Sequence, residues 1–217
     1  MPPEQLLIVG TGGLAREAAQ LARRIDARGL RWHSIGFVGR TRDEVGAPLA
    51  GGSVLYCDDD LTQLAEPADV VIAIGHPAPR RAVASRLRSH AGLRFPNLIH
   101  PGLEVDTTSV QMGVGNMLTL GVVMTCDIRI GDFNLVNWNT TIGHDAVVGS
   151  YNVINPASSI SGHVQLADAC LLGTGCRVLE GLTIGSGVTI GAGAVVTRSI
   201  AEPGVWVGVP ARELPPR

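Results

Sequence analysis

Long hydrophobic runs, aromatic residues and clustered basic residues are all scarce in this chain of 217 residues. No apolar run reaches the ~18–20 residues that a membrane-spanning helix needs, and MPPEQLLIVG lacks the basic region and cleavage site of a signal peptide, so we expect a cytoplasmic protein without a membrane span. The net charge is −2, and the Lys and Arg residues are scattered. This pattern argues against a nucleic-acid partner, which would require a basic stripe, and favours small-molecule or protein partners.

Cysteine is also scarce, whereas glycine is abundant. The four cysteines form no CxxC pair, which argues against a disulfide framework. Aromatic residues make up only 4% of the chain, and there are 28 glycines. The core must therefore consist of aliphatic side chains on a backbone with many tight corners, a composition that suggests a repeat.

The first hundred residues alternate between expected strands and helices. The strands are LLIVG, SIGFV, SVLY and DVVIAIG, and the segment GTGGLAREAAQLARRI contains a helix that follows the first of them. A strand, a Gly-rich turn, a helix and a second strand form the βαβ unit of a small parallel sheet.

From residue 106 onward the sequence repeats every six residues. When it is divided into hexads from Asp106, fifteen of the sixteen first positions are Met, Leu, Ile or Val, and seven second positions are Gly. The fifth positions are small or aliphatic except at Asn116, Asn134 and Asn152. Neither a helix nor an alternating strand has this period, whereas a solenoid does.

Three hexads per turn give about 18 residues per coil, with the first position of each hexad facing inward. In this respect the sequence resembles the hexapeptide-repeat acyltransferases, which fold as a left-handed parallel β-helix. The resemblance and the βαβ pattern together predict an α/β Rossmann-like domain over residues 1–100, followed by an all-β left-handed β-helix over residues 101–217. Third-position residues such as His144 should then face outward.

The stretch NTTIGHDAVVG places His144 beside Asp145. A histidine is well suited to act as a general base near neutral pH, and a carboxylate can fix its tautomer. The carboxylate could be that of Asp145 or one from a neighbouring coil or subunit, and the alternative is that both residues are solvated corner residues.

The segments GHD, SISGHV, LLGTGC, TIGAGAVV, VGVPAR and LIHPG are similar to one subgroup of these enzymes. This subgroup comprises the nucleotide-amino-sugar N-acetyltransferases and the sialic-acid O-acetyltransferases. The resemblance implies that His144 is the catalytic base, that Asp145 tunes it, and that Asn137 lies beside the acceptor amine. It also implies a homotrimer with acetyl-coenzyme A in the groove between subunits.

Small residues along one edge would let the pantetheine arm approach closely. The resemblance assigns the Gly162 N–H to the oxyanion and predicts cofactor contacts at Gly162, Gly173, Thr174, Gly191, Ala192 and Gly193, with no metal. The glycines also fit the alternative of ordinary tight corners. Where bacillosamine-type relatives carry a second histidine, this chain has Val153, and His163 is a candidate substitute or a surface residue.

In the N-terminal half, Gly10, Gly12 and Gly13 belong to a GxGxxA pattern that favours a phosphate at a helix N-terminus. The second strand ends in Gly39 and Arg40 without the acid that a nicotinamide enzyme needs, so a nucleotide-linked sugar fits better than a dinucleotide. By resemblance, Gly75, His76 and Arg80 line the same pocket, although packing or surface roles are equally open to them.

The leading hypothesis is therefore an acetyl-coenzyme A-dependent N-acetyltransferase that acts on a nucleotide-linked amino sugar in surface polysaccharide or glycan synthesis. The alternatives are sugar O-acetylation, an inactive scaffold, and a γ-type carbonic anhydrase. The last of these needs three converging histidines, whereas His144 and His163 occupy different hexad positions.

Overall fold

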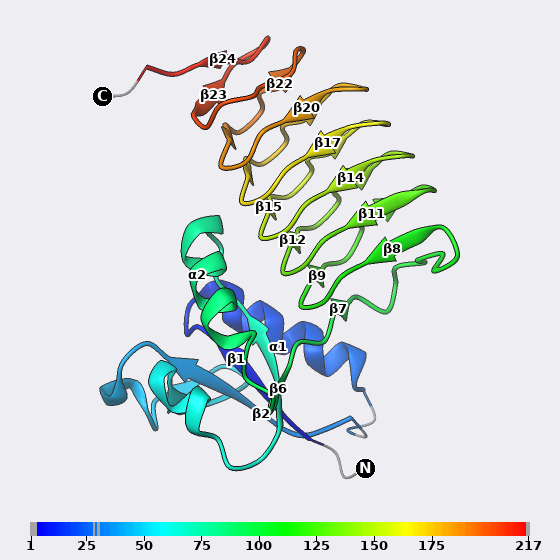
Figure 1. The fold of residues 1–217 in the computed structure, drawn as a ribbon. Coiled ribbons are helices and arrows are strands. Elements are labelled where there is room, and N and C mark those ends of the chain that lie inside the picture. Colours follow the sequence, from blue (N-terminus) through cyan, green and yellow to red (C-terminus); the bar gives the residue numbers. More distant parts are fainter. Residues whose placement is uncertain (1–3, 28, 30, 216–217) are drawn as a thin grey trace.

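The computed structural model of the chain describes residues 4–27, 29 and 31–215. It shows a small α/β domain from which a triangular prism of parallel strands rises, as Figure 1 shows. The expected fold class, a Rossmann-like domain followed by a left-handed β-helix, is confirmed. Among the described residues, no helix has the length and apolar character to cross a bilayer.

The N-terminal sheet has the strand order β3-β4-β2-β1-β5-β6. β1 pairs in parallel with β2 and β5, as expected for a βαβ unit, and α1 and α2 follow β1 and β5. Its elements are β1 (Glu4–Val9), α1 (Gly13–Ile25), β2 (Trp32–Gly39), the 3₁₀ helix η1 (Arg42–Glu44), β3 (Pro48–Leu49), β4 (Gly52–Cys57), the 3₁₀ helix η2 (Asp58–Gln63), β5 (Ala68–Ile72), α2 (Pro77–Leu87) and β6 (Leu93–Arg94).

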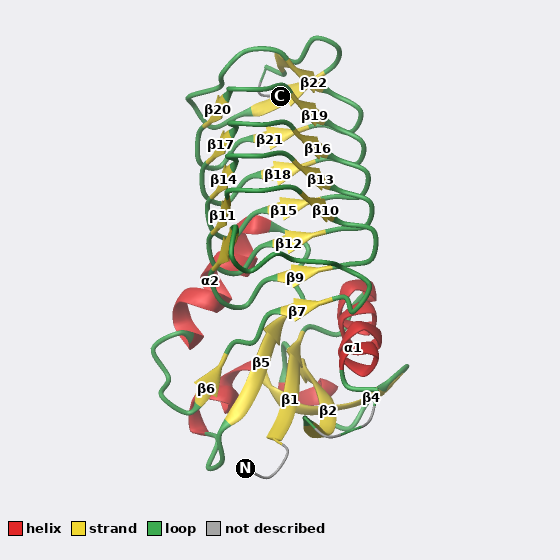
Figure 2. Ribbon diagram, turned by 90° about the vertical axis from the view of Figure 1, so that its right-hand side faces the viewer, coloured by secondary structure: helices red, strands yellow, loops and turns green. Residues whose placement is uncertain are grey.

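The β-helix consists of three ladders of short strands, which Figure 2 shows stacked above the N-terminal sheet. The first ladder contains β10 (Val123–Met124), β13 (Thr141–Ile142), β16 (Ser159–Ile160), β19 (Arg177–Val178) and β22 (Val195–Val196). The second contains β8 (Val110–Met112), β11 (Ile128–Ile130), β14 (Val147–Val148), β17 (Gln165–Leu166) and β20 (Thr183–Ile184). The third contains β7 (Leu98–Ile99), β9 (Met117–Leu118), β12 (Leu135–Val136), β15 (Val153–Ile154), β18 (Leu171–Leu172), β21 (Thr189–Ile190), β23 (Val205–Val207) and β24 (Arg212–Glu213).

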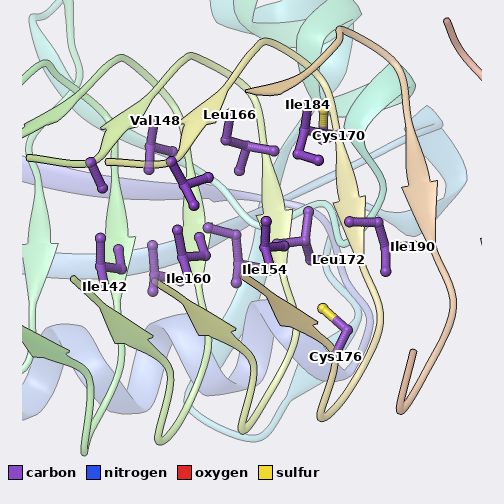
Figure 3. Close-up of a cluster of buried hydrophobic side chains, with 14 of the residues drawn as sticks. Ile142, Val148, Ile154, Ile160, Leu166, Cys170, Leu172, Cys176, Ile184 and Ile190 are labelled. Carbon is purple, nitrogen blue, oxygen red and sulfur yellow. The ribbon is translucent and has the colours of Figure 1, made fainter. Parts of the chain in front are cut away.

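The strand register confirms the expected coil of 18 residues. Thr141 pairs with Ser159, which in turn pairs with Arg177, and the other central pairs keep the same offset. The first hexad positions from Ile130 to Val196 are at most 4% exposed, and several of these side chains point into the prism in Figure 3. Full burial of one such side chain is worth ~1.5–3 kcal/mol.

The corners of the prism have a regular backbone conformation. The fourth residue of each hexad from Gly115 to Gly193 has a positive φ, which is 58° at Asp145 and 56° at His163. Such a left-handed residue turns the chain sharply between two short strands, so third- and fourth-position side chains project from the corners.

The three fifth-position asparagines form a buried ladder. The Asn134 amide nitrogen donates to Asn116 Oδ1 at 3.0 Å and to the Gly149 carbonyl at 2.9 Å. The backbone N–H of Asn152 donates to Asn134 Oδ1 at 2.9 Å. Each of the three side-chain oxygens accepts a backbone N–H of the following coil, and the Asn116 and Asn134 amide nitrogens donate to backbone carbonyls, so these polar groups are accommodated inside an otherwise aliphatic prism. The Asn152 amide nitrogen is buried without a partner.

α1 lies between the N-terminal sheet and the prism. Its alanine-rich face and Leu21 pack in one core with Leu98, Met117, Leu135 and Val153 from the third ladder. α2 packs against a prism corner, where Ala84 and Ile72 bury Phe133. These contacts join the two parts of the chain on two sides.

Candidate active site

His144 and Asp145 lie at the corner that follows β13, and both side chains are about half exposed. His144 Nδ1 and Asp145 Oδ2 are 2.8 Å apart. Because a carboxylate accepts hydrogen bonds, this contact assigns the imidazole proton to Nδ1 and leaves the lone pair on Nε2. The outward orientation expected for His144 is confirmed.

His163 lies beside this pair, which the hexad comparison did not anticipate. It follows Asp145 by 18 residues, so it occupies the same corner in the next coil. The His144 and His163 ring centroids are 5.1 Å apart at an interplanar angle of 88°, and His163 Nε2 is 3.7 Å from Asp145 Oδ2. The signal was present in the sequence as the 18-residue spacing of Asp145 and His163.

One ligand atom from each of His144, Asp145 and His163 lies within 4.8 Å of the other two. Two imidazole nitrogens and a carboxylate oxygen are a donor set suited to a transition-metal ion. The donor atoms of this cluster therefore suit the binding of such an ion as well as the acceptance of a proton by His144.

Gly162 lies directly under the His144 ring. A Cβ at this position would be 2.7 Å from both Cε1 and Nε2 of His144, so only glycine lets the imidazole adopt this position. The backbone N–H of Gly162 has no hydrogen-bond acceptor within the part of the chain that the structure describes. At another corner, by contrast, the N–H groups of Asp132 and Ser150 are capped by third-position side chains of the following coil.

Asn137 and most of the small residues expected to bind the cofactor lie at a different corner from His144. Asn137 is 8% exposed, and its amide contacts Asn155 Oδ1 at 3.4 Å. Gly173 and Gly191 continue the same column at intervals of 18 residues. Within one chain these residues are separated from His144 by the width of one face of the prism.

This second corner has a shape suited to a thin acyl carrier. A Cβ at Gly173 would lie 2.5 Å from the Ala192 nitrogen, so the coils stack tightly there, whereas a Cβ at Gly193 would have no neighbour within 4 Å. Thr174, Ala192 and Gly193 are exposed. The residues present therefore fit the narrow pantetheine arm and thioester of acetyl-coenzyme A.

The Gly-rich loop of the N-terminal domain leads into the uncapped N-terminus of α1. Gly10 has φ +120°, and a Cβ there would approach the Ala73 carbonyl oxygen at 3.0 Å. Gly12 is the N-cap of α1, no side chain caps that helix, and its first turn has no acid. Gly12 and Gly13 are exposed, so free N–H groups and the helix dipole favour a phosphate.

Glu44 supplies a carboxylate beside this loop, which inspection of the strand end alone missed. Its Oε1 accepts the Arg40 N–H at 2.9 Å, and its Oε2 accepts the Thr11 hydroxyl at 3.1 Å. Hydrogen bonds from the backbone N–H groups of Thr41 and Arg40, together with the Thr11 hydroxyl, lower the pKa of Glu44. The capping-box spacing from Thr41 to Glu44 was the sequence signal for this turn.

Gly75 and His76 are exposed at the start of α2, where His76 is the N-cap. A Cβ on Gly75 would contact Leu14 of α1 at 3.7 Å, so this segment adjoins the Gly-rich loop. Arg80 differs from both because its side chain is completely buried. In this structure it has no surface open to a ligand.

The prism and the N-terminal domain are those of an acetyltransferase that uses acetyl-coenzyme A, as the family model of the repeat and similar solved structures with bound acetyl coenzyme A or CoA show. The family model for the PglD N-terminal domain matches residues 5–87, and the model for the bacterial transferase hexapeptide (six repeats) matches residues 163–198. The chain belongs to the hexapeptide-repeat sugar acyltransferase family.

Several solved structures resemble the whole chain. PerB from Caulobacter crescentus, in complex with CoA and GDP-perosamine, is 30% identical with a TM-score of 0.85, and the match covers 97% of each chain. The acetyltransferase domain of PglB from Neisseria gonorrhoeae, in complex with acetyl coenzyme A, is 28% identical with a TM-score of 0.88, and the match covers 98% of this chain and 100% of that one. WeeI from Acinetobacter baumannii is 27% identical with a TM-score of 0.84, and the match covers 96% and 99% of the two chains.

Proposed function

We propose that the protein transfers the acetyl group of acetyl-coenzyme A to the amine of a nucleotide-linked amino sugar, with His144 as general base. The observation that carries this proposal is the His144–Asp145 hydrogen bond, which leaves Nε2 free above Gly162. The complex of PerB with GDP-perosamine supports the acceptor class.

The reaction needs no nucleophilic side chain. The amine nitrogen attacks the thioester carbonyl carbon, and His144 Nε2 takes the proton that the nitrogen loses. The tetrahedral intermediate then expels the coenzyme A thiolate, which receives that proton from the imidazolium. Asp145 holds the imidazole in the required tautomer and stabilises its charged form.

The uncapped Gly162 N–H is our candidate for the oxyanion donor. It lies under the base and has no acceptor within the described chain. A preorganised donor at a developing oxyanion contributes ~3–4 kcal/mol to transition-state stabilisation. The donor role of Gly162 rests on this position and on the absence of a cap.

The acceptor would bind at the carboxyl ends of the central strands of the N-terminal sheet. Its diphosphate lies at the N-terminus of α1, at Gly12 and Gly13, and Glu44 offers an acceptor for a ribose hydroxyl. Gly75 and His76 form the adjoining wall. We assign this reaction to the cytoplasm and to surface polysaccharide or glycan synthesis.

A homotrimer would complete the site. Asn137 and the small-residue edge lie at a different corner from His144, and a neighbouring subunit can bring that corner to the base. The large apolar side chains of Leu120, Val123 and Trp138 are 49%, 55% and 43% exposed around this region of the prism. Burial of such a patch between subunits is favourable.

Thiol release from acetyl-coenzyme A tests this proposal, measured against UDP-, GDP- and dTDP-linked amino sugars and free sialic acid. We expect turnover with one nucleotide-linked amine and a product that carries one amide-linked acetyl group. Turnover only with a hydroxyl acceptor would replace N-acetylation with O-acetylation. Failure to bind acetyl-coenzyme A at all would favour an inactive scaffold.

A further inference from the structure

Arg80 is the most deeply buried charged side chain in the described chain, with 0% of its surface exposed. Burial lowers the pKa of its guanidinium to about 10, well below its ordinary value, so it remains a cation at neutral pH. No carboxylate forms a salt bridge with it among the described residues. An unneutralised buried cation is costly for a fold, so its contacts call for an explanation.

Two carbonyl groups from distant parts of the chain hold this guanidinium. Arg80 Nε donates to the Phe133 carbonyl at 2.6 Å, and Nη1 donates to the Ile74 carbonyl at 2.9 Å. The remaining nitrogen, Nη2, is buried without a partner. The rigid guanidinium thus bridges the N-terminal domain and the prism.

The two bridged segments are those that the proposed reaction must bring together. Ile74 directly precedes Gly75 and His76, the segment beside the Gly-rich loop. Phe133 lies in the same coil of the prism as Asn137 and His144. The Phe133 ring is fixed in turn by Phe95, at a centroid distance of 5.1 Å, and by Tyr151, at 5.8 Å.

We propose that Arg80 is a positioning residue that fixes the acceptor-binding segment relative to the coil that carries His144. The inference rests on the proposed function, and it replaces direct substrate binding by Arg80 with action through Ile74 and Phe133. The structure supports it because one buried group joins the two carbonyls while it remains inaccessible to any ligand. Acceptor turnover should therefore depend on Arg80, whereas acetyl-coenzyme A binding should not.

The test compares Arg80→Met, which removes the charge and the donors, with Arg80→Lys, which keeps a charge but cannot form the same fork. Arg86→Met is the matched control, because Arg86 lies on the same helix and pairs with Asp58 and Asp59 within the N-terminal domain. We expect Arg80→Met to lose about tenfold or more in kcat/KM for the acceptor and Arg80→Lys to be intermediate. The Kd of the Arg80 variants for acetyl-coenzyme A and the kinetics of Arg86→Met should stay within about twofold of the native values.

An Arg80→Met variant that keeps native kcat/KM would overturn the proposal. An equal loss in acetyl-coenzyme A affinity would also overturn it, because Arg80 would then only maintain the fold. If Arg80→Met does not fold, Arg80→Ala supplemented with methylguanidinium takes its place. Recovery of acceptor turnover supports the bridge, whereas recovery of the melting temperature without turnover contradicts it.

Hydrogen exchange provides a readout that needs no acceptor. In the Arg80 variants, exchange should become faster in peptides that cover residues 74–80 and 131–136 and stay unchanged in the coils near the C-terminus. If native protein shows no turnover with any acceptor, the proposed function fails, yet this exchange result still decides whether the bridge exists. Unchanged exchange at both segments would refute the bridge.

Discussion

The two halves of the molecule differ in how directly their sequence determines the position of a side chain. In the prism, a residue and the one 18 positions later share a column, so the 18-residue spacing of Asp145 and His163 places both, with the adjacent His144, at one corner. In the N-terminal domain, the position of a side chain depends on how helices pack against sheet and prism, as Arg80 shows. A repeat thus makes long-range contacts predictable from spacing, whereas an irregular α/β domain does not.

The largest expected effect is at the corner formed by His144 and Asp145, where we propose that the general base lies. His144→Ala should lower kcat by at least about a hundredfold, because positioned general bases typically contribute 10²–10⁴-fold. Thiol release at saturating acceptor measures the effect. His163→Ala, which removes the neighbouring imidazole, is the matched control and should change kcat by only a few-fold. Equal losses in the two variants would contradict the assignment of the base to His144.

Breaking the regularity of the prism from inside should have the next largest effect. Asn134→Ala removes both ladder donors and the acceptor for the Asn152 N–H, so we expect a loss of about 2–4 kcal/mol in the free energy of unfolding. Denaturant titration measures this loss. Asn139→Ala is the control, since Asn139 is exposed and alanine already occupies the same left-handed position at Ala157 and Ala169. Comparable destabilisation by both variants would show that the buried ladder contributes no more to the free energy of unfolding than an exposed asparagine does.

Two glycine variants contrast the halves directly. Gly162→Ala places a Cβ 2.7 Å from the His144 ring, which must move away from Asp145, so kcat should fall about tenfold with little change in stability. In Gly12→Ala the added Cβ meets no atom within 4 Å, so kcat should stay native. Because Gly12 lies where we place the diphosphate of the acceptor, only the acceptor KM should rise. Steady-state kinetics separate the two outcomes. A Gly162→Ala variant with native kcat and a raised acceptor KM would contradict the role of Gly162 in positioning the His144 imidazole.

The smallest expected effect is a difference in acid stability. Folding lowers the pKa of Glu44 from its usual 4.5 and that of Asp60 from 3.8, mainly through backbone hydrogen bonds from Thr41 and Cys57. Acids with a depressed folded pKa stabilise the fold above their ordinary pKa, and this contribution is lost as pH falls through the folded value. The N-terminal domain should therefore loosen below about pH 4.5 before the central coils do.

Hydrogen exchange of β1 and of the central coils, followed as pH decreases, tests this order. Glu44→Gln should remove part of the pH dependence of the N-terminal domain, whereas Glu180→Gln on the prism surface should not. Simultaneous loosening of both halves would contradict the expected order.

Much of the fold was predictable from spacing, since the aliphatic first positions and the 18-residue coil specify the prism, and the βαβ pattern specifies the parallel sheet. The His144–Asp145 contact follows from adjacency at a left-handed corner. The return of Glu44 to Thr11 and the burial of Arg80 were not foreseen, because both depend on contacts between residues 33 and 53 positions apart without a repeat to set their register. The roles assigned to Asn137 and the small-residue corner depend on how subunits assemble.

The most direct test of the account is the distance between the acceptor nitrogen and His144 Nε2 in a crystal structure with coenzyme A and the nucleotide-linked amine that turns over. We predict about 2.6–3.2 Å, with the diphosphate at the N-terminus of α1. An acceptor nitrogen placed beyond direct or water-mediated hydrogen bonding of His144, with the coenzyme A sulfur beside another group, would contradict it.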